Sequence, residues 1–165
     1  MKKVGVLLAV LTASIPAVSS AGTAYFPHYL VNSVATQADG SIVGVYSAIH
    51  VSNVSGTTQT VTIELHDLSG APLANHPVKV WNASWGVSSA TTDASGRIQV
   101  TLVAMGALSV ELEPSSFPAS GWGKITGTDP AALIADVTEY GRLPAYAYPG
   151  TAYSVSYVVN GGAPF

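Results

Sequence analysis

Apolar and polar residues alternate with a period of two along much of this 165-residue chain. The segment IVGVYSAIHVSNV shows the pattern at its longest. Its Val45, Ile49 and Val51 share one face, while Tyr46 and His50 share the other. Because successive side chains of a strand point to opposite faces, this segment predicts a strand with one face buried.

The same alternation recurs in TVTIELHD, RIQVTLVA and ALSVELE. Turn-forming segments lie between the alternating ones: VSGTT, DLSGAPLANHP, TDASGR and AMGA. Further strands are expected at 78–82, 121–127 and 152–159. We therefore predict an all-β fold, an immunoglobulin-like antiparallel β-sandwich of about seven to nine strands, formed by a single domain over residues 22–165.

The segment DPAALIADVTEYG carries signals for both a helix and a strand. Asp129 can cap a helix, and Pro130 suits its first turn. In a strand, Leu133, Ala135 and Val137 would instead share one face. We predict a strand, because the neighbouring segments are strands.

The first 21 residues, MKKVGVLLAVLTASIPAVSSA, have the pattern of a secretory signal peptide. Two lysines precede an apolar run over 4–18, and small residues precede a cleavage site after Ala21, with Ala24 as the alternative. The run is too short to span a membrane, so no span is expected after cleavage. We predict a secreted protein that is extracellular or at the cell surface, with the periplasm as the alternative location.

Composition narrows the choice of partners. The chain has no cysteine, so no disulfide can stabilise the fold. Without the two lysines of the signal, four basic residues stand against nine acidic ones. Nucleic acids and anionic membrane surfaces are therefore not expected as partners, since both require clusters of Lys and Arg. Copies of the chain itself or other surface proteins are expected instead.

Four segments, YFPHYLVN, YSAIHVSNVSGTTQTVTIELHDLSGAPL, VTLVAMGALSVELEP and SGWGKITGTDPAALIADVTEY, together resemble a group of bacterial exported β-sandwich domains. The resemblance spans roughly residues 25–140 and supports a strand over 131–139. GAPLANHPVKVWN and SSATTDASGRIQVTL are similar to carboxypeptidase-regulatory-like and bacterial immunoglobulin-like modules, although the insert VKVWNASWGVSSATTD is longer than the first group carries. Both resemblances imply a structural, display or adhesion role and supply no catalytic residue.

Few residues suggest catalysis. No Gly-x-Ser-x-Gly segment is present, and Ser69 and Ser95 lie in predicted turns. His66 and His76 flank a loop, but their spacing matches no known metal motif. The glutamates of the ELE segment at 111–113 share a strand face and are interpreted as solubilising charges. We expect no catalytic residue, no metal and no cofactor.

Aromatic residues suggest binding instead. Trp81 and Trp85, together with Tyr46 and His50 on the outward face of the first long strand, are candidates for a surface that stacks on a sugar or peptide. Trp122, between two glycines, is predicted to lie in the core.

The two ends of the domain are apolar and extended. Their candidate assembly residues are Tyr25, Phe26, Tyr153, Val155, Tyr157, Val159 and Phe165. One interpretation is that both ends form edge strands of the same molecule, with the last residues, GGAPF, ending freely. The other is that a terminal strand completes the sheet of a neighbour. We predict a non-catalytic secreted structural protein, a filament or coat subunit that assembles through these strands, with a carbohydrate- or peptide-binding module as the alternative.

Overall fold

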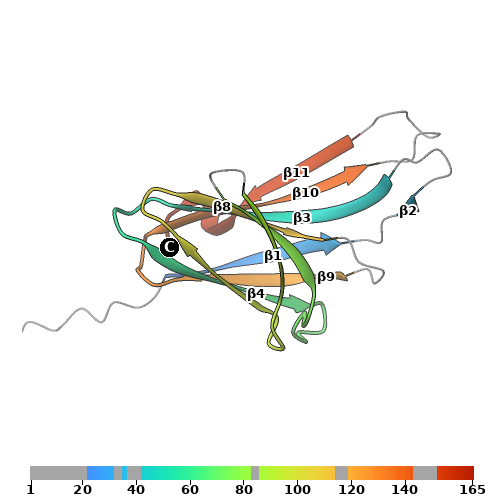
Figure 1. Cartoon of the computed structure of the whole chain (residues 1–165), viewed down its shortest axis with the longest axis horizontal. Helices are drawn as coiled ribbons and strands as arrows, with labels where there is room; N and C mark the ends of the chain where they lie inside the picture. The colour runs from blue at the N-terminus through green and yellow to red at the C-terminus, as the bar shows by residue number, and fades with distance from the viewer. Residues whose placement is uncertain (1–21, 32–34, 37–41, 83–85, 114–118, 143–151) are drawn as a thin grey trace, which may run out of the picture.

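The computed structural model describes residues 22–31, 35–36, 42–82, 86–113, 119–142 and 152–165 (Figure 1). The predicted signal peptide, residues 1–21, lies outside this part of the chain. The elements are β1 (Thr23–Val31), β2 (Ala35–Thr36), β3 (Ile42–Asn53), β4 (Gln59–Asp67), β5 (Pro77–Asn82), β6 (Val87–Thr91), β7 (Arg97–Leu102), β8 (Ala107–Leu112), β9 (Ala119–Gly127), β10 (Leu133–Arg142), β11 (Ala152–Val158) and the 3-10 turn η1 (Val159–Gly162).

The strands form two antiparallel sheets. The smaller sheet has the order β1-β9-β4-β7, and the larger has the order β11-β10-β3-β8-β5-β6, with β2 paired to one end of β3. Figure 1 shows the two layers, with β10, β3 and β8 in one and β1, β9 and β4 in the other. The predicted all-β antiparallel sandwich is confirmed.

The strands of the described chain outnumber the predicted seven to nine. The additional ones are β2 and β6. All five residues of β6 are exposed, and its sequence VSSAT shows little alternation. Backbone pairing with β5 therefore holds β6 in the sheet. Because β6 has no buried face, its sequence shows no alternation that would predict a strand.

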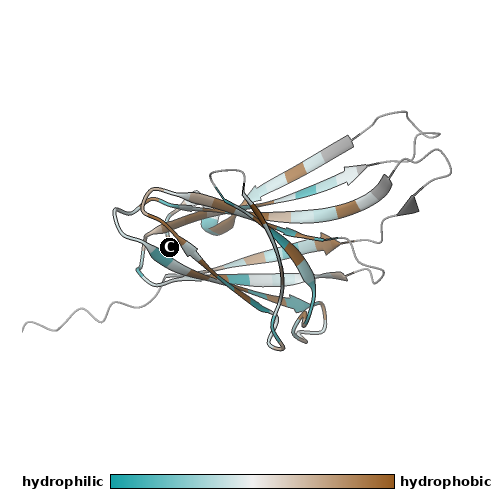
Figure 2. Ribbon diagram, viewed as in Figure 1, coloured by the Kyte–Doolittle hydropathy of each residue, from teal (hydrophilic) through white to brown (hydrophobic). Residues whose placement is uncertain are grey.

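The core lies between the sheets and follows the predicted alternation (Figure 2). Its largest fully buried side chains include Phe26, Tyr29, Ile49, Ile63, Leu65, Leu112, Ile125 and Leu133. Within DPAALIADVTEYG the chain forms a strand from Leu133 onward, as predicted, and not a helix, while Asp129 and Pro130 lie in the preceding turn. The carboxylate of Asp129 caps no helix and accepts a 2.6 Å hydrogen bond from the side-chain amide of the buried Gln59.

Strand β9 corrects one prediction. Gly121, Gly123 and Ile125 are buried on its inner face, so Trp122 lies on the outer face and is only half-buried. A Cβ at Gly123 would stand 2.0 Å from the ring of Phe26. The prediction that Trp122 is a core residue is wrong, because the glycines make room for Phe26 of the adjacent strand and not for the tryptophan.

Strands β1 and β11 are edge strands, one in each sheet. After β11, Asn160, Gly161 and Gly162 adopt positive φ and turn the chain back. Phe165 is then buried, with 6% of its surface exposed, and its N–H donates a 2.9 Å hydrogen bond to the carbonyl of Leu133. The expectation that GGAPF ends freely is wrong, because the segment packs into the core.

Contacts between the sheets close the side of the sandwich near β1. The hydroxyl of Ser47 on β3 donates to the carbonyl of Leu30 on β1 and accepts from its N–H, at 3.0 and 2.9 Å. His28 on β1 and Glu139 on β10 form an ion pair at 2.5 Å when the histidine is protonated. β1 is therefore joined to the larger sheet of its own chain.

Candidate binding site on the outer face of the larger sheet

Four neighbouring strands of the larger sheet, β5, β8, β3 and β10, position the candidate site. In their register, Ser109 on β8 lies opposite Trp81 on β5 and opposite His50 on β3. Tyr140 on β10 lies opposite Tyr46 on β3. All five side chains point outward because the alternate positions of these strands form the core.

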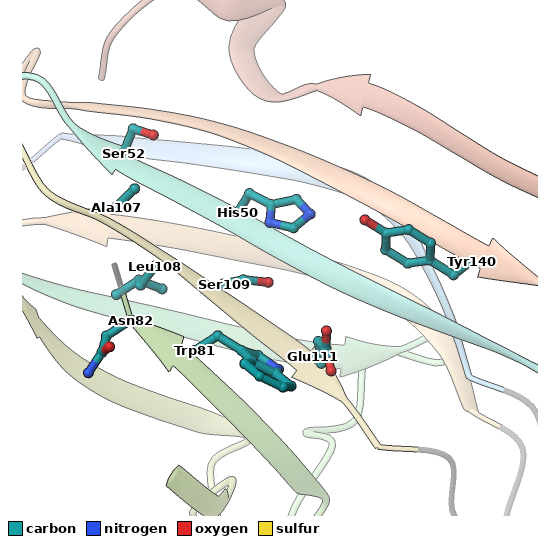
Figure 3. Close-up of a pocket in the computed structure, with 9 residues that line it drawn as sticks. All are labelled: His50, Ser52, Trp81, Asn82, Ala107, Leu108, Ser109, Glu111 and Tyr140. Atoms are coloured by element: carbon teal, nitrogen blue, oxygen red, sulfur yellow. The ribbon is translucent and has the colours of Figure 1, made fainter. Parts of the chain in front are cut away.

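A depression of about 510 Å³ opens on this face. It is lined by His50, Ser52, Trp81, Asn82, Ala107, Leu108, Ser109, Glu111 and Tyr140. Figure 3 shows His50, Ser109 and Glu111 between Trp81 on one side and Tyr140 on the other. A volume of this size lies within the range of ligand pockets, about 300–1,000 Å³.

Two tyrosines border the depression. The rings of Tyr46 and Tyr140 stack, with centroids 5.1 Å apart and planes inclined by 21°. Burial raises the pKa of the Tyr46 phenol, and the nearby Glu111 and Tyr140 raise it further. The Glu111 carboxylate therefore lies close enough to the two stacked tyrosines for its charge to raise the pKa of Tyr46.

Two of the lining residues each have a buried polar atom that lacks a partner. The Nε1 of Trp81 and the Oγ of Ser109 are buried, and neither has a hydrogen bond to any part of the chain that the structure describes. Leaving a buried polar group unpaired costs about 1–3 kcal/mol. The hydroxyls of Tyr29 and Tyr157 and the Nε2 of His76 likewise lack partners elsewhere in the described chain, so unpaired buried atoms are not particular to this depression.

Three of the four residues predicted for binding, Tyr46, His50 and Trp81, lie together at this site, and Trp85 falls outside the described residues. Sequence reasoning did not place Ser109, Tyr140 or Glu111 at this depression. The other glutamate of the ELE segment, Glu113, forms an ion pair with Lys79 at 2.7 Å. The alternation in ALSVELE predicts which of its residues face outward. It does not predict that this strand lies beside the strand that carries Trp81.

The outer face of the smaller sheet carries a second polar cluster. Glu64 accepts hydrogen bonds from His66, Arg97 and Lys124 at 2.8, 3.0 and 3.1 Å. Burial raises the pKa of Glu64, but the hydrogen bonds from these three side chains outweigh it and lower that pKa to about 2. Trp122 stacks on His66 with ring centroids 4.3 Å apart. The carboxylate is fully engaged by Arg97, Lys124 and His66 of its own chain.

Of the remaining chemical candidates, the aspartates have structural partners, whereas the buried Nε2 of His76 has none within the described chain. The carboxylates of Asp67 and Asp93 accept hydrogen bonds from the N–H groups of Ser69 and Ser95, both at 2.8 Å, which confirms the predicted turns. Burial lowers the pKa of His76. Across the described ranges, no three His, Asp or Glu side chains gather as a metal site requires.

Comparison with family models, curated proteins and solved structures finds no match to this chain. Among its described residues, no helix has the length and apolar character needed to cross a membrane. The case for the site rests on its geometry.

Proposed function

We propose that the chain is an exported, non-catalytic binding module whose ligand occupies the depression on the outer face of the larger sheet. The observation that carries the proposal is the meeting of the aromatic Trp81 and Tyr140 with the polar His50, Ser109 and Glu111 in one depression of about 510 Å³. Aromatic side chains and a few convergent polar groups in a concave surface are typical of ligand sites.

The composition of the lining favours binding over hydrolysis. Within the described lining, Glu111 is the single carboxylate, whereas glycoside hydrolysis generally uses a pair that face each other across the bond. Within the described chain, the hydroxyl of Ser109 has no hydrogen-bond partner, so His50 does not activate it as a nucleophile. The signal-like N-terminal segment supports export, where such modules meet glycans and peptides.

A glycan array and a peptide library, probed with the mature chain, test the proposal. Trp81→Ala should abolish the binding that the wild type shows. Trp122→Ala is the matched control, because Trp122 is also half-buried on an outer face but belongs to the opposite sheet. Binding that survives Trp81→Ala, or a wild type that binds nothing on either array, would overturn the proposal.

A specific observation also supports assembly through a terminal strand as a second candidate function. β11 is an edge of the larger sheet, and its Val155 and Val158 are 57% and 59% exposed. Phe26, Val159 and Phe165 belong to the core of their own chain, so they are not available to a neighbour.

The assembly surface is therefore narrower than the sequence suggested. Tyr25 on β1 is 63% exposed, Tyr157 is half-buried against the core, and the side chain of Tyr153 is outside the described part. Light scattering coupled to size exclusion should show oligomers that Val155→Lys dissociates, while Ser88→Lys on β6 leaves them intact. A wild-type monomer would remove this candidate.

A further inference from the structure

The charge and the aromatic rings of the depression specify the class of its ligand, an inference that rests on the proposed function. We propose that the depression binds an amino sugar, whose ammonium group pairs with the carboxylate of Glu111 while its rings pack on Trp81 and Tyr140. Three features of the molecule support this assignment: a carboxylate without a partner, the aromatic rings around it, and the position of both in the middle of the sheet.

Glu111 presents a negative charge that the chain does not neutralise. Its side chain is partly exposed, so a ligand in the depression can reach it. Within the described chain the carboxylate forms no hydrogen bond and no ion pair. Lys79, directly opposite on β5, is held by Glu113 at 2.7 Å instead. On the other side stands Ala48 of β3, which is fully buried and has only a methyl group. The charge of Glu111 is therefore available to a ligand.

Aromatic rings surround this carboxylate. Figure 3 shows Glu111 beside Trp81, with Tyr140 on the far side of β3. Both rings are partly exposed, and Tyr46 stacks on Tyr140. Burial and then the charge of Glu111 raise the pKa of Tyr46, which indicates that the carboxylate is within electrostatic reach of the tyrosine pair. Because the face of an aromatic ring attracts cations, a cation bound to Glu111 gains from the rings as well.

The same groups select a cation over other ligands. The described lining contains no Lys or Arg, so Glu111 would repel an anionic ligand without compensation. A neutral sugar could donate one hydrogen bond to Glu111 from a hydroxyl. An ammonium group donates up to three, and a hydrogen bond between two ionised groups is shorter and stronger than one to a neutral group. A sugar with an ammonium group should therefore bind more tightly than the same sugar with a hydroxyl.

The position of the depression favours a sugar over a peptide. Extended peptides gain affinity by adding a strand to a free sheet edge. The depression lies over β8 and β3, and each of them is already paired on both sides. Recognition here must come from side chains, and aromatic rings such as Trp81 and Tyr140 offer a surface on which the apolar face of a sugar ring packs.

The two aromatic residues also indicate the length of the ligand. Trp81 lies on β5 and Tyr140 on β10, with β8 and β3 between them. Three strand spacings separate the two residues, a distance of about 14 Å across the sheet. A ligand that contacts both rings must therefore be an oligosaccharide, because a single sugar ring is too short.

Isothermal titration of the mature chain tests the inference with three β-1,4-linked hexasaccharides. The glucosamine hexamer carries the ammonium groups, the glucose hexamer has a hydroxyl in place of each, and the N-acetylglucosamine hexamer has a neutral amide. The glucosamine hexamer should bind about 10-fold more tightly than either neutral probe. Glu111→Gln, which keeps the size of the side chain and removes its charge, should reduce this preference to less than about 2-fold.

Two controls separate a specific contact from general attraction to an acidic chain. Glu64→Gln removes the same charge from the outer face of the opposite sheet and should leave the preference for the glucosamine hexamer intact. Hexalysine carries as many ammonium groups on a peptide and should bind more weakly than the glucosamine hexamer. Because Glu111 has no ion pair within the described chain, Glu111→Gln should not shift the midpoint of urea denaturation, which excludes a structural cause for its effect.

Three results would overturn the inference: the glucosamine hexamer binds no more tightly than the glucose hexamer, Glu111→Gln retains the preference, or hexalysine binds as tightly as the glucosamine hexamer. In each of these cases the proposed binding function still stands if Trp81→Ala removes hits from the glycan array or the peptide library. If no hit on either depends on Trp81, both fail.

Discussion

The contact between Gly123 and Phe26 allows a sharp test of the packing between β9 and β1. A Cβ added at Gly123 would lie 2.0 Å from the tip of the Phe26 ring and 2.6 and 2.7 Å from the two adjacent ring carbons, where ordinary contact begins at 3.4 Å. The ring is fully buried and cannot swing into solvent. Gly123→Ala must therefore move the ring by more than about 1 Å within a packed core.

The expected cost follows from two opposing effects. Overpacking a core typically costs about 1–3 kcal/mol, and the depth of this overlap places the cost near about 3 kcal/mol. Replacing Gly by Ala also restricts the unfolded chain, which stabilises the fold by about 0.4–1 kcal/mol. We predict a net loss of about 2 kcal/mol in the free energy of unfolding.

Urea denaturation followed by tryptophan fluorescence measures this loss. Gly56→Ala is the matched control, because nothing lies within 4 Å of its added Cβ, and it should change stability by less than about 0.5 kcal/mol. In a Phe26→Leu background, whose side chain is shorter, Gly123→Ala should cost at least about 1 kcal/mol less. An equal cost in both backgrounds, or a variant as stable as Gly56→Ala, would refute the packing argument.

Three further predictions concern single side chains. Glu64, whose pKa is lowered to about 2 from 4.5, contributes stability that is present above pH 4.5 and is lost as the pH falls towards 2. Glu64→Gln should therefore cost about 1–2 kcal/mol at pH 7, allowing for its solvent-exposed partners, and progressively less as the pH falls through about 2. A difference that is independent of pH in urea titrations would contradict this. Phe165→Ala should lower the free energy of unfolding by about 3 kcal/mol in the same assay, because it leaves a cavity at a buried position. A loss below about 1 kcal/mol would show that the C-terminal segment is not part of the core. Asn53→Ala should lower the midpoint of thermal unfolding by about 5–10 °C. The reason is that the buried side-chain amide of Asn53 donates hydrogen bonds to the carbonyls of Thr57 and Val103 at 2.7 and 2.9 Å. An unchanged midpoint would contradict this prediction.

The alternation of apolar residues determined the local structure of this chain. Val61, Ile63 and Leu65 are buried and the residues between them face outward, because a strand cannot change which side chains share a face without shifting by one residue. The turns at Asp67 and Asp93 were equally predictable, since each aspartate forms hydrogen bonds within its own turn. Interactions of this kind are local and are therefore encoded in short segments.

Only the tertiary structure decided which segments became neighbours. Tyr46, His50 and Trp81 could be identified as outward aromatic and polar residues, but Ser109 and Glu111 joined them because β8 lies between β3 and β5. Trp122 and Phe165 were assigned to the wrong environments for the same reason. A period of two determines the faces of a strand, whereas the order of strands in a sheet and the occupant of each space between the sheets depend on contacts between residues far apart in the chain.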